Sequence, residues 1–116
     1  MNSQEFDEAL QKLDLCESIL REYTGDNTLD YGICRVLRGR IHISLGDTLS
    51  ATKFLKQAEK IIEKAVGSSN SYMKGVYYCL FTAYTLSQDH THALEYQKKY
   101  KDLNQTLRLS NHKMNR

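Results

Sequence analysis

An internal repeat constrains this chain more than any other feature of its sequence. Alanine recurs at a constant interval of 42 residues, at Ala9, Ala51 and Ala93. An acidic residue precedes each alanine by four positions, as Glu5, Asp47 and Asp89. A fixed period of this length is typical of solenoids, in which each unit packs only against its neighbours. The repeat therefore predicts a stack of similar units that forms a single domain over residues 1–116.

The repeated units are predicted to be helical. Proline is absent and only six glycines interrupt regular structure. Apolar residues around the first two alanines recur with the helical period, in one stripe of Phe6, Ala9, Leu10, Leu13, Cys16 and Leu20 and another of Ala51, Phe54, Leu55, Ala58, Ile61, Ile62 and Ala65. Asn2 and Glu5 can form a capping box, and turn-forming residues occupy 24–28 and 67–70. We expect an all-α fold of five antiparallel helices near 3–22, 28–45, 48–66, 70–87 and 90–109.

The predicted helices fall into a half repeat and two complete repeats. Segments 28–45 and 70–87 carry apolar residues on more than one face, so each is expected to contact neighbours on two sides. We predict a half repeat over 3–22, full repeats over 28–66 and 70–109, and a frayed tail over 110–116.

The second unit resembles a tetratricopeptide repeat. Its matching positions are Gly39, Gly46, Asp47, Ala51, Leu55 and Ala58, and the third unit matches through Tyr77, Leu80, Tyr84, Asp89 and Ala93. Three positions depart from the family pattern. His42 occupies a position that is usually aromatic, Arg38 occupies one that is usually apolar, and Phe81 occupies the glycine position in the third unit. The period is longer than that of the common form of this repeat and is similar to that of the long-helix variety of the family. The resemblance implies a right-handed solenoid of helical hairpins.

The resemblance also implies a concave groove, lined by the first helix of each pair, that binds a protein or peptide. Residues expected to line it are Arg35, Leu37, Arg38, Arg40, Ser44, Lys74, Tyr78 and Thr82. No acidic residue lies between Tyr31 and Gly46, so we expect an acidic peptide or an acidic partner protein, because arginine binds carboxylates bidentately. The alternatives are that the arginines only solubilise a helix and that Tyr78 belongs to an aromatic core. A carboxylate clamp of the chaperone-binding type is not expected, since Val36, Leu37, Gly75 and Cys79 occupy its positions.

The first helix lacks a preceding partner in this pattern, which suggests a fragment or an edge that another subunit covers. Because an uncovered apolar stripe is costly, self-association is the alternative hypothesis, in which the chain is a homo-oligomeric segment of a larger regulator. The candidate surface comprises Phe6, Leu10, Leu13 and Tyr23.

Other functions are not expected. The net charge of +2 is too small to indicate nucleic-acid binding, and no run of about 20 apolar residues could span a membrane. Without a secretory signal the protein is expected in the cytoplasm. Cys16, Cys34 and Cys79 lack metal-binding spacing and are predicted to be reduced and buried, while His90 and His92 are two residues apart and do not face each other on a helix. We therefore expect no enzymatic activity, no metal and no cofactor.

Overall fold

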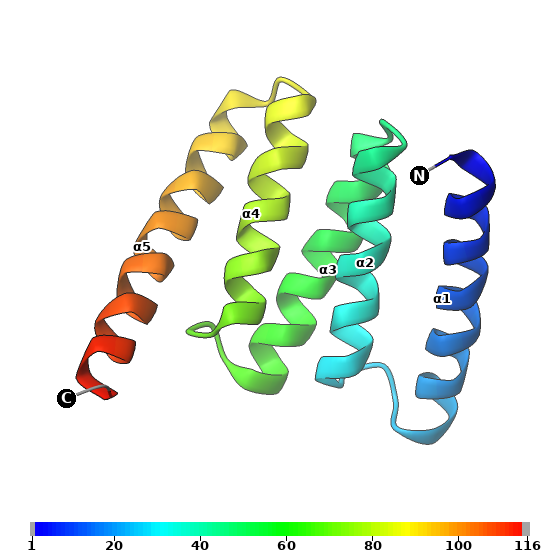
Figure 1. The fold of residues 1–116 in the computed structure, drawn as a ribbon, viewed down its shortest axis with the longest axis horizontal. Helices are drawn as coiled ribbons and strands as arrows, with labels where there is room; N and C mark the ends of the chain where they lie inside the picture. Colours follow the sequence, from blue (N-terminus) through cyan, green and yellow to red (C-terminus); the bar gives the residue numbers. More distant parts are fainter. Residues whose placement is uncertain (1, 115–116) are drawn as a thin grey trace.

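The computed structural model describes the backbone of residues 2–114 and the side chains of residues 2–110. Within that range the prediction of an all-α fold with five helices is confirmed: α1 (Ser3–Tyr23), α2 (Leu29–Ser44), α3 (Thr48–Val66), α4 (Ser71–Leu86) and α5 (His90–Met114). Successive helices run in opposite directions, and α2 lies in front of α3 (Figure 1). The molecule measures 46 × 38 × 22 Å, so its shortest dimension accommodates two layers of helices. None of the described helices is long and apolar enough to cross a membrane.

The helix ends lie within one residue of the predicted ones, except at the C-terminus. There α5 continues past residue 109 to Met114, so the predicted tail is helical at least that far, and residues 115 and 116 lie outside the described range. The capping box of Asn2 and Glu5 is present as predicted. Every helix start is capped by a polar side chain that accepts a hydrogen bond from the backbone three residues on, at Asn2, Thr28, Asp47, Asn70 and Asp89.

The sequence repeat is reproduced in the helix boundaries. Helix α4 begins and ends one full period after α2, and α5 likewise begins one period after α3. The bends repeat as well, because Gly46 and Gln88, which are separated by the same interval, both have positive φ angles of 80° and 62°. A left-handed backbone conformation is unusual for glutamine. The two repeats therefore share the conformation of this bend although they do not share the glycine.

The apolar core lies between α3, α4 and α5, with α2 against it. Its members are Ala51, Leu55, Ala58, Ile62, Met73, Val76, Leu80, Ala83, Tyr96 and Leu103. Helix α2 approaches α3 closely because it carries glycine at the contacts. A Cβ atom on Gly39 would lie 2.5 Å from Leu55 Cγ, and one on Gly32 would lie 2.6 Å from Ile62 Cγ1.

One polar group in this core is fully satisfied. Tyr96 is completely buried, and its hydroxyl donates to Glu59 at 3.0 Å and accepts from Lys56 at 2.7 Å. Burial raises the pKa of Tyr96 to about 12, so the hydroxyl keeps its proton and remains a donor. The three side chains tie α3 to α5 without leaving an unpaired buried group.

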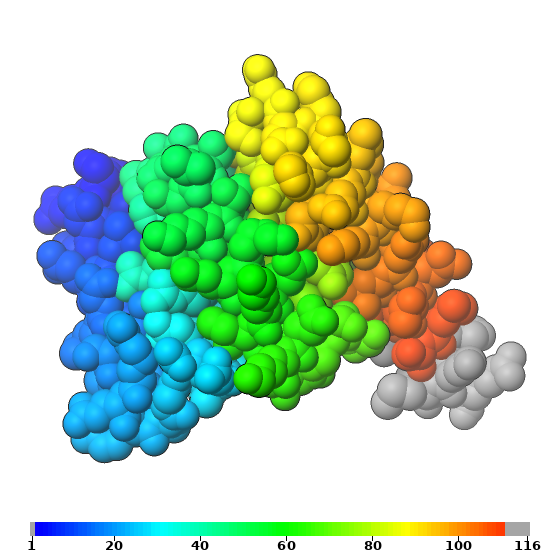
Figure 2. Space-filling view, turned by 180° about the vertical axis from the view of Figure 1, so that it is seen from behind, coloured from blue at the N-terminus to red at the C-terminus, as the bar shows by residue number. Residues whose placement is uncertain are grey.

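Helix α1 lies at one edge of the fold. It packs only on α2, whereas α2 also contacts α3 and α4, and α4 contacts α2, α3 and α5. The prediction that the second and fourth helices have neighbours on two sides is therefore confirmed. In α1 itself only Leu13 and Glu17 are buried. The opposite face of the molecule has α3 at its centre, between α1 and α5 (Figure 2).

Candidate partner-binding groove

An open groove with a volume of about 820 Å³ lies between α1, α2 and α4. Most of the side chains that line it are apolar. They are Phe6, Ala9, Lys12, Leu13 and Cys16 from α1, Leu37, Arg40, Ile41, Ile43 and Ser44 from α2, and Tyr78, Cys79 and Thr82 from α4. Its size is within the range of sites that bind small molecules or anchor side chains of a peptide.

Five of the eight residues predicted for the groove line it together. Leu37, Arg40 and Ser44 recur at helical spacing along α2, and Tyr78 and Thr82 do so along α4. Tyr78 is 53% exposed, so it does not belong to the apolar core. Its ring lies 5.6 Å from that of Tyr100 in α5, which restricts the orientation of the Tyr78 side chain.

The α1 wall consists of residues predicted for a different role. Phe6 and Leu13 were expected on a self-association surface, but both line the groove, and Leu13 is only 9% exposed because α2 covers it. Leu10 is half-buried in the same helix. Of the predicted self-association residues only Tyr23 is largely exposed, at 76%. The apolar stripe of α1 therefore turns inward, onto the chain's own α2.

The groove is positively charged. Lys12 and Arg40 line it, and among its described lining residues none is acidic. Neither side chain takes part in an ion pair with the described residues. Burial raises the pKa of the Cys79 thiol, and the charge of Arg40 opposes that shift, so this charge reaches the groove wall. A carboxylate at the groove would thus find two cations that none of the described acidic side chains neutralises.

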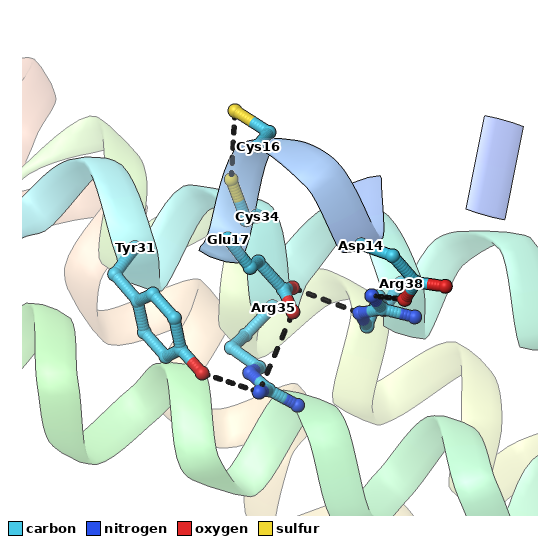
Figure 3. A network of polar contacts seen from close by, with 7 residues as sticks. All are labelled: Asp14, Cys16, Glu17, Tyr31, Cys34, Arg35 and Arg38. Atoms are coloured by element: carbon cyan, nitrogen blue, oxygen red, sulfur yellow. Dashed lines mark hydrogen bonds and ion pairs between the residues drawn. The ribbon is translucent and has the colours of Figure 1, made fainter. Parts of the chain in front are cut away.

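Two of the predicted groove arginines bind α1 instead (Figure 3). Arg38 Nε donates to Glu17 Oε1 at 2.8 Å, and its Nη2 contacts Asp14. Arg35 Nη2 lies 3.5 Å from Glu17 Oε2 and also contacts the hydroxyl of Tyr31. Neither arginine lines the groove, so the expectation that they would meet a partner there is not met.

The hydrogen bonds of this cluster keep Arg38 charged although it is largely buried. Glu17 is only 1% exposed and the side chain of Arg38 only 11%. Burial alone would lower the pKa of Arg38, but its hydrogen bonds with Glu17 and Asp14 raise it overall. Phe54 of α3 supports both arginines, with its ring centroid 5.4 Å from Arg35 Cζ and 5.9 Å from Arg38 Cζ. The cluster is a structural junction between α1 and α2.

The remaining predicted residue, Lys74, does not line the groove. Its Nζ lies 6.0 Å from the ring centroid of Tyr100. Conversely, the sequence analysis did not assign six other lining residues to the groove: Ala9, Lys12, Cys16, Ile41, Ile43 and Cys79. The apolar stripe of the first helix could have predicted Ala9 and Cys16, because an apolar stripe has to be covered by another part of the molecule.

Among the described residues no cluster of three or more His, Cys, Asp or Glu side chains could hold a metal ion. His92 Nδ1 instead lies 2.7 Å from Asp89 Oδ2, and its ring stacks on Tyr84. No family model, no curated protein and no solved structure shows a significant match to this chain.

Proposed function

We propose that this chain is a non-catalytic scaffold of the tetratricopeptide-repeat type, which binds a segment of another protein in the groove between α1, α2 and α4. The observation that carries the proposal is the groove itself, with its apolar walls and two cations free of internal partners among the described residues. Two observations support the repeat assignment: both helices of the second pair begin one period after those of the first, and α4 contacts both α2 and α3.

The preferred ligand is an amphipathic segment with an acidic residue, rather than a strongly acidic peptide. Since Arg35 and Arg38 are bound to Glu17, the groove offers only Arg40 and Lys12 to a carboxylate. An exposed ion pair contributes about 0–1 kcal/mol, whereas burying one large apolar side chain contributes about 1.5–3 kcal/mol. Apolar anchors should therefore provide most of the affinity, and the cations should orient the segment.

Selection from a random peptide library displayed on phage tests this function, followed by fluorescence anisotropy with the selected peptides. Leu37→Asp places a charge in the apolar groove and should weaken binding at least about tenfold. Arg40→Glu should weaken it less, by about two- to fivefold, for acidic peptides.

Matched controls come from outside the groove. Leu49→Asp, at a position 83% exposed in α3, and Arg108→Glu, at an exposed position in α5, should leave the affinity unchanged. Circular dichroism establishes that each variant keeps its helical content. Peptides that bind Leu37→Asp as tightly as the original chain would show that the groove is not their site.

A second candidate function is self-assembly, and one observation favours it. Leu15, Ile19 and Tyr23 recur every four residues on α1 and are 64%, 47% and 76% exposed. They form an apolar ridge on α1, which packs against α2 alone. Light scattering after size-exclusion chromatography should then report a dimer that Ile19→Glu dissociates. A monomer at high concentration would contradict this alternative and leave the groove proposal intact.

A further inference from the structure

Two cysteines from neighbouring helices lie close together at the junction of α1 and α2. Cys16 belongs to α1 and Cys34 to α2, and the Cys34 thiol points toward Cys16 with 4.0 Å between the two sulfur atoms (Figure 3). The third cysteine, Cys79, belongs to α4 and faces the groove. Sequence spacing gave no indication of the pair, because the two residues meet only when α1 docks on α2.

The two thiols differ in their access to solvent. Cys34 is 6% exposed, whereas Cys16 is exposed, contrary to the expectation that all three cysteines are buried. Burial and, to a smaller extent, the neighbouring Cys16 and Glu17 raise the pKa of Cys34 to about 11. Because the thiolate is the reactive form, a reagent from solvent should react at Cys16, while Cys34 persists as a thiol beside it.

The helices can bring the sulfur atoms together without disturbing the core. A disulfide requires the sulfurs to approach to about 2.05 Å. Helix α1 packs on α2 alone and contributes no residue to the core cluster, so a small shift of α1 leaves the packing of α3, α4 and α5 intact.

We propose that Cys16 and Cys34 form a redox pair, in which oxidation by a hydroperoxide closes a disulfide that fixes α1 to α2. The Cys16 thiol releases its proton and the thiolate attacks one oxygen of hydrogen peroxide; the O–O bond breaks, a sulfenic acid forms, and the leaving hydroxide takes up the released proton as water. The sulfur of Cys34 then attacks the sulfur of Cys16, the S–O bond breaks, and the hydroxide takes the proton of Cys34. Two thiols are oxidised to a disulfide, and one peroxide is reduced to two waters.

The disulfide acts on the wall of the groove. Cys16 lines it alongside Phe6, Ala9 and Leu13, so joining Cys16 to Cys34 holds this wall against α2. The pair itself rests on the two thiols alone and does not depend on what the groove binds.

Thiol counting and disulfide mapping test the pair in the full chain. After treatment with hydrogen peroxide, the free thiols measured in denaturant should fall from three to one, and a non-reduced digest should contain the Cys16–Cys34 cross-link. A reductant should restore all three thiols. Amide hydrogen exchange in α1 should be at least about tenfold slower in the oxidised chain, because the cross-link opposes detachment of α1.

Single variants separate this pair from other thiol chemistry. Cys79→Ser should form the same cross-link, whereas Cys16→Ser should form none. Cys34→Ala should stop at a sulfenic acid on Cys16, which dimedone traps. A Cys16–Cys79 cross-link, disulfides between chains only, or an intramolecular cross-link in Cys34→Ala would overturn the proposal.

Discussion

Helix α2 binds its two neighbours by opposite kinds of contact. Toward α3 it presents Gly32 and Gly39, which let Leu55 and Ile62 approach within van der Waals contact of its backbone. Toward α1 it presents arginines that bind Glu17. The first contact excludes water over a continuous apolar core, whereas the second combines a small number of ion pairs with an apolar stripe of which only Leu13 is buried in α1.

This difference predicts that the region α2 to α5 is more stable than the docking of α1. Apolar burial accumulates over every core residue, so α2 to α5 should unfold as one cooperative unit. A partly buried ion pair gains less, because removing charges from water offsets their attraction. Helix α1 is therefore expected to detach before the rest of the chain unfolds, and the groove, which includes its wall, should depend on this docking.

The largest effect is expected from a cavity in the core. Leu55→Ala removes a completely buried side chain at the contact with Gly39 and should lower the free energy of unfolding by about 2–5 kcal/mol. Urea denaturation followed by circular dichroism measures the loss. Leu49→Ala, at an exposed position of the same helix, should stay within about 0.5 kcal/mol. Equal effects of the two variants would contradict the placement of the core.

A smaller, local effect is expected at the polar junction. Glu17→Ala leaves Arg35 and Arg38 without their shared carboxylate and should weaken the docking of α1 by about 1–3 kcal/mol, since Asp14 still contacts Arg38. Hydrogen exchange should accelerate in α1 but not in α3. Glu8→Ala, at an exposed position of α1, is the control and should change neither. Equal loss of protection in α1 and α3 would show that the two regions are not independent.

The close approach of α2 and α3 predicts opposite signs for two glycine substitutions. Alanine in a helix is about 1 kcal/mol more favourable than glycine, so Gly75→Ala, whose Cβ would have no heavy atom within 4 Å, should stabilise the protein by up to that amount. At Gly39 the new Cβ would lie 2.5 Å from Leu55 Cγ, and overpacking costs about 1–3 kcal/mol. Gly39→Ala should therefore be net destabilising. The difference between the unfolding free energies of the two variants measures how closely α2 packs on α3 at Gly39. If both substitutions stabilised the protein, this close packing would be refuted.

The smallest effect is expected from acid, at the exposed starts of α3 and α5. The hydrogen bond with Ser50 holds the pKa of Asp47 below its ordinary value of 3.8, and the hydrogen bond with His92 does the same for Asp89. These lowered pKa values contribute stability that is present above about pH 4 and is lost as the pH falls through them. Asp47→Asn keeps an acceptor at the cap but does not titrate. Its unfolding free energy should fall less steeply below pH 4 than that of the original chain, and identical slopes would exclude this contribution.

The sequence by itself determined the helices and their register. The predicted helix ends agree with the observed ones to within one residue, up to the start of α5. They could be predicted because capping side chains and apolar periodicity act over only a few residues. The constant repeat interval related the boundaries of one unit to those of the next. As a result α2 and α4 occupy equivalent positions, and so do the starts of α3 and α5. The far end of α5 was missed, since no capping or breaking residue marks it. For the candidate site, the resemblance to the tetratricopeptide repeat supplied the lining residues of α2 and α4, among them Leu37, Arg40 and Tyr78.

Only the tertiary structure decided which of these side chains are free to meet a partner. Arg38 and Arg40 are two residues apart and read alike in the sequence, yet one binds Glu17 and the other lines the groove. The approach of Cys16 to Cys34 likewise depends on how α1 lies against α2. Such contacts join residues far apart in the chain, so they depend on the angle and depth at which two helices pack, and no local pattern of residues specifies either quantity.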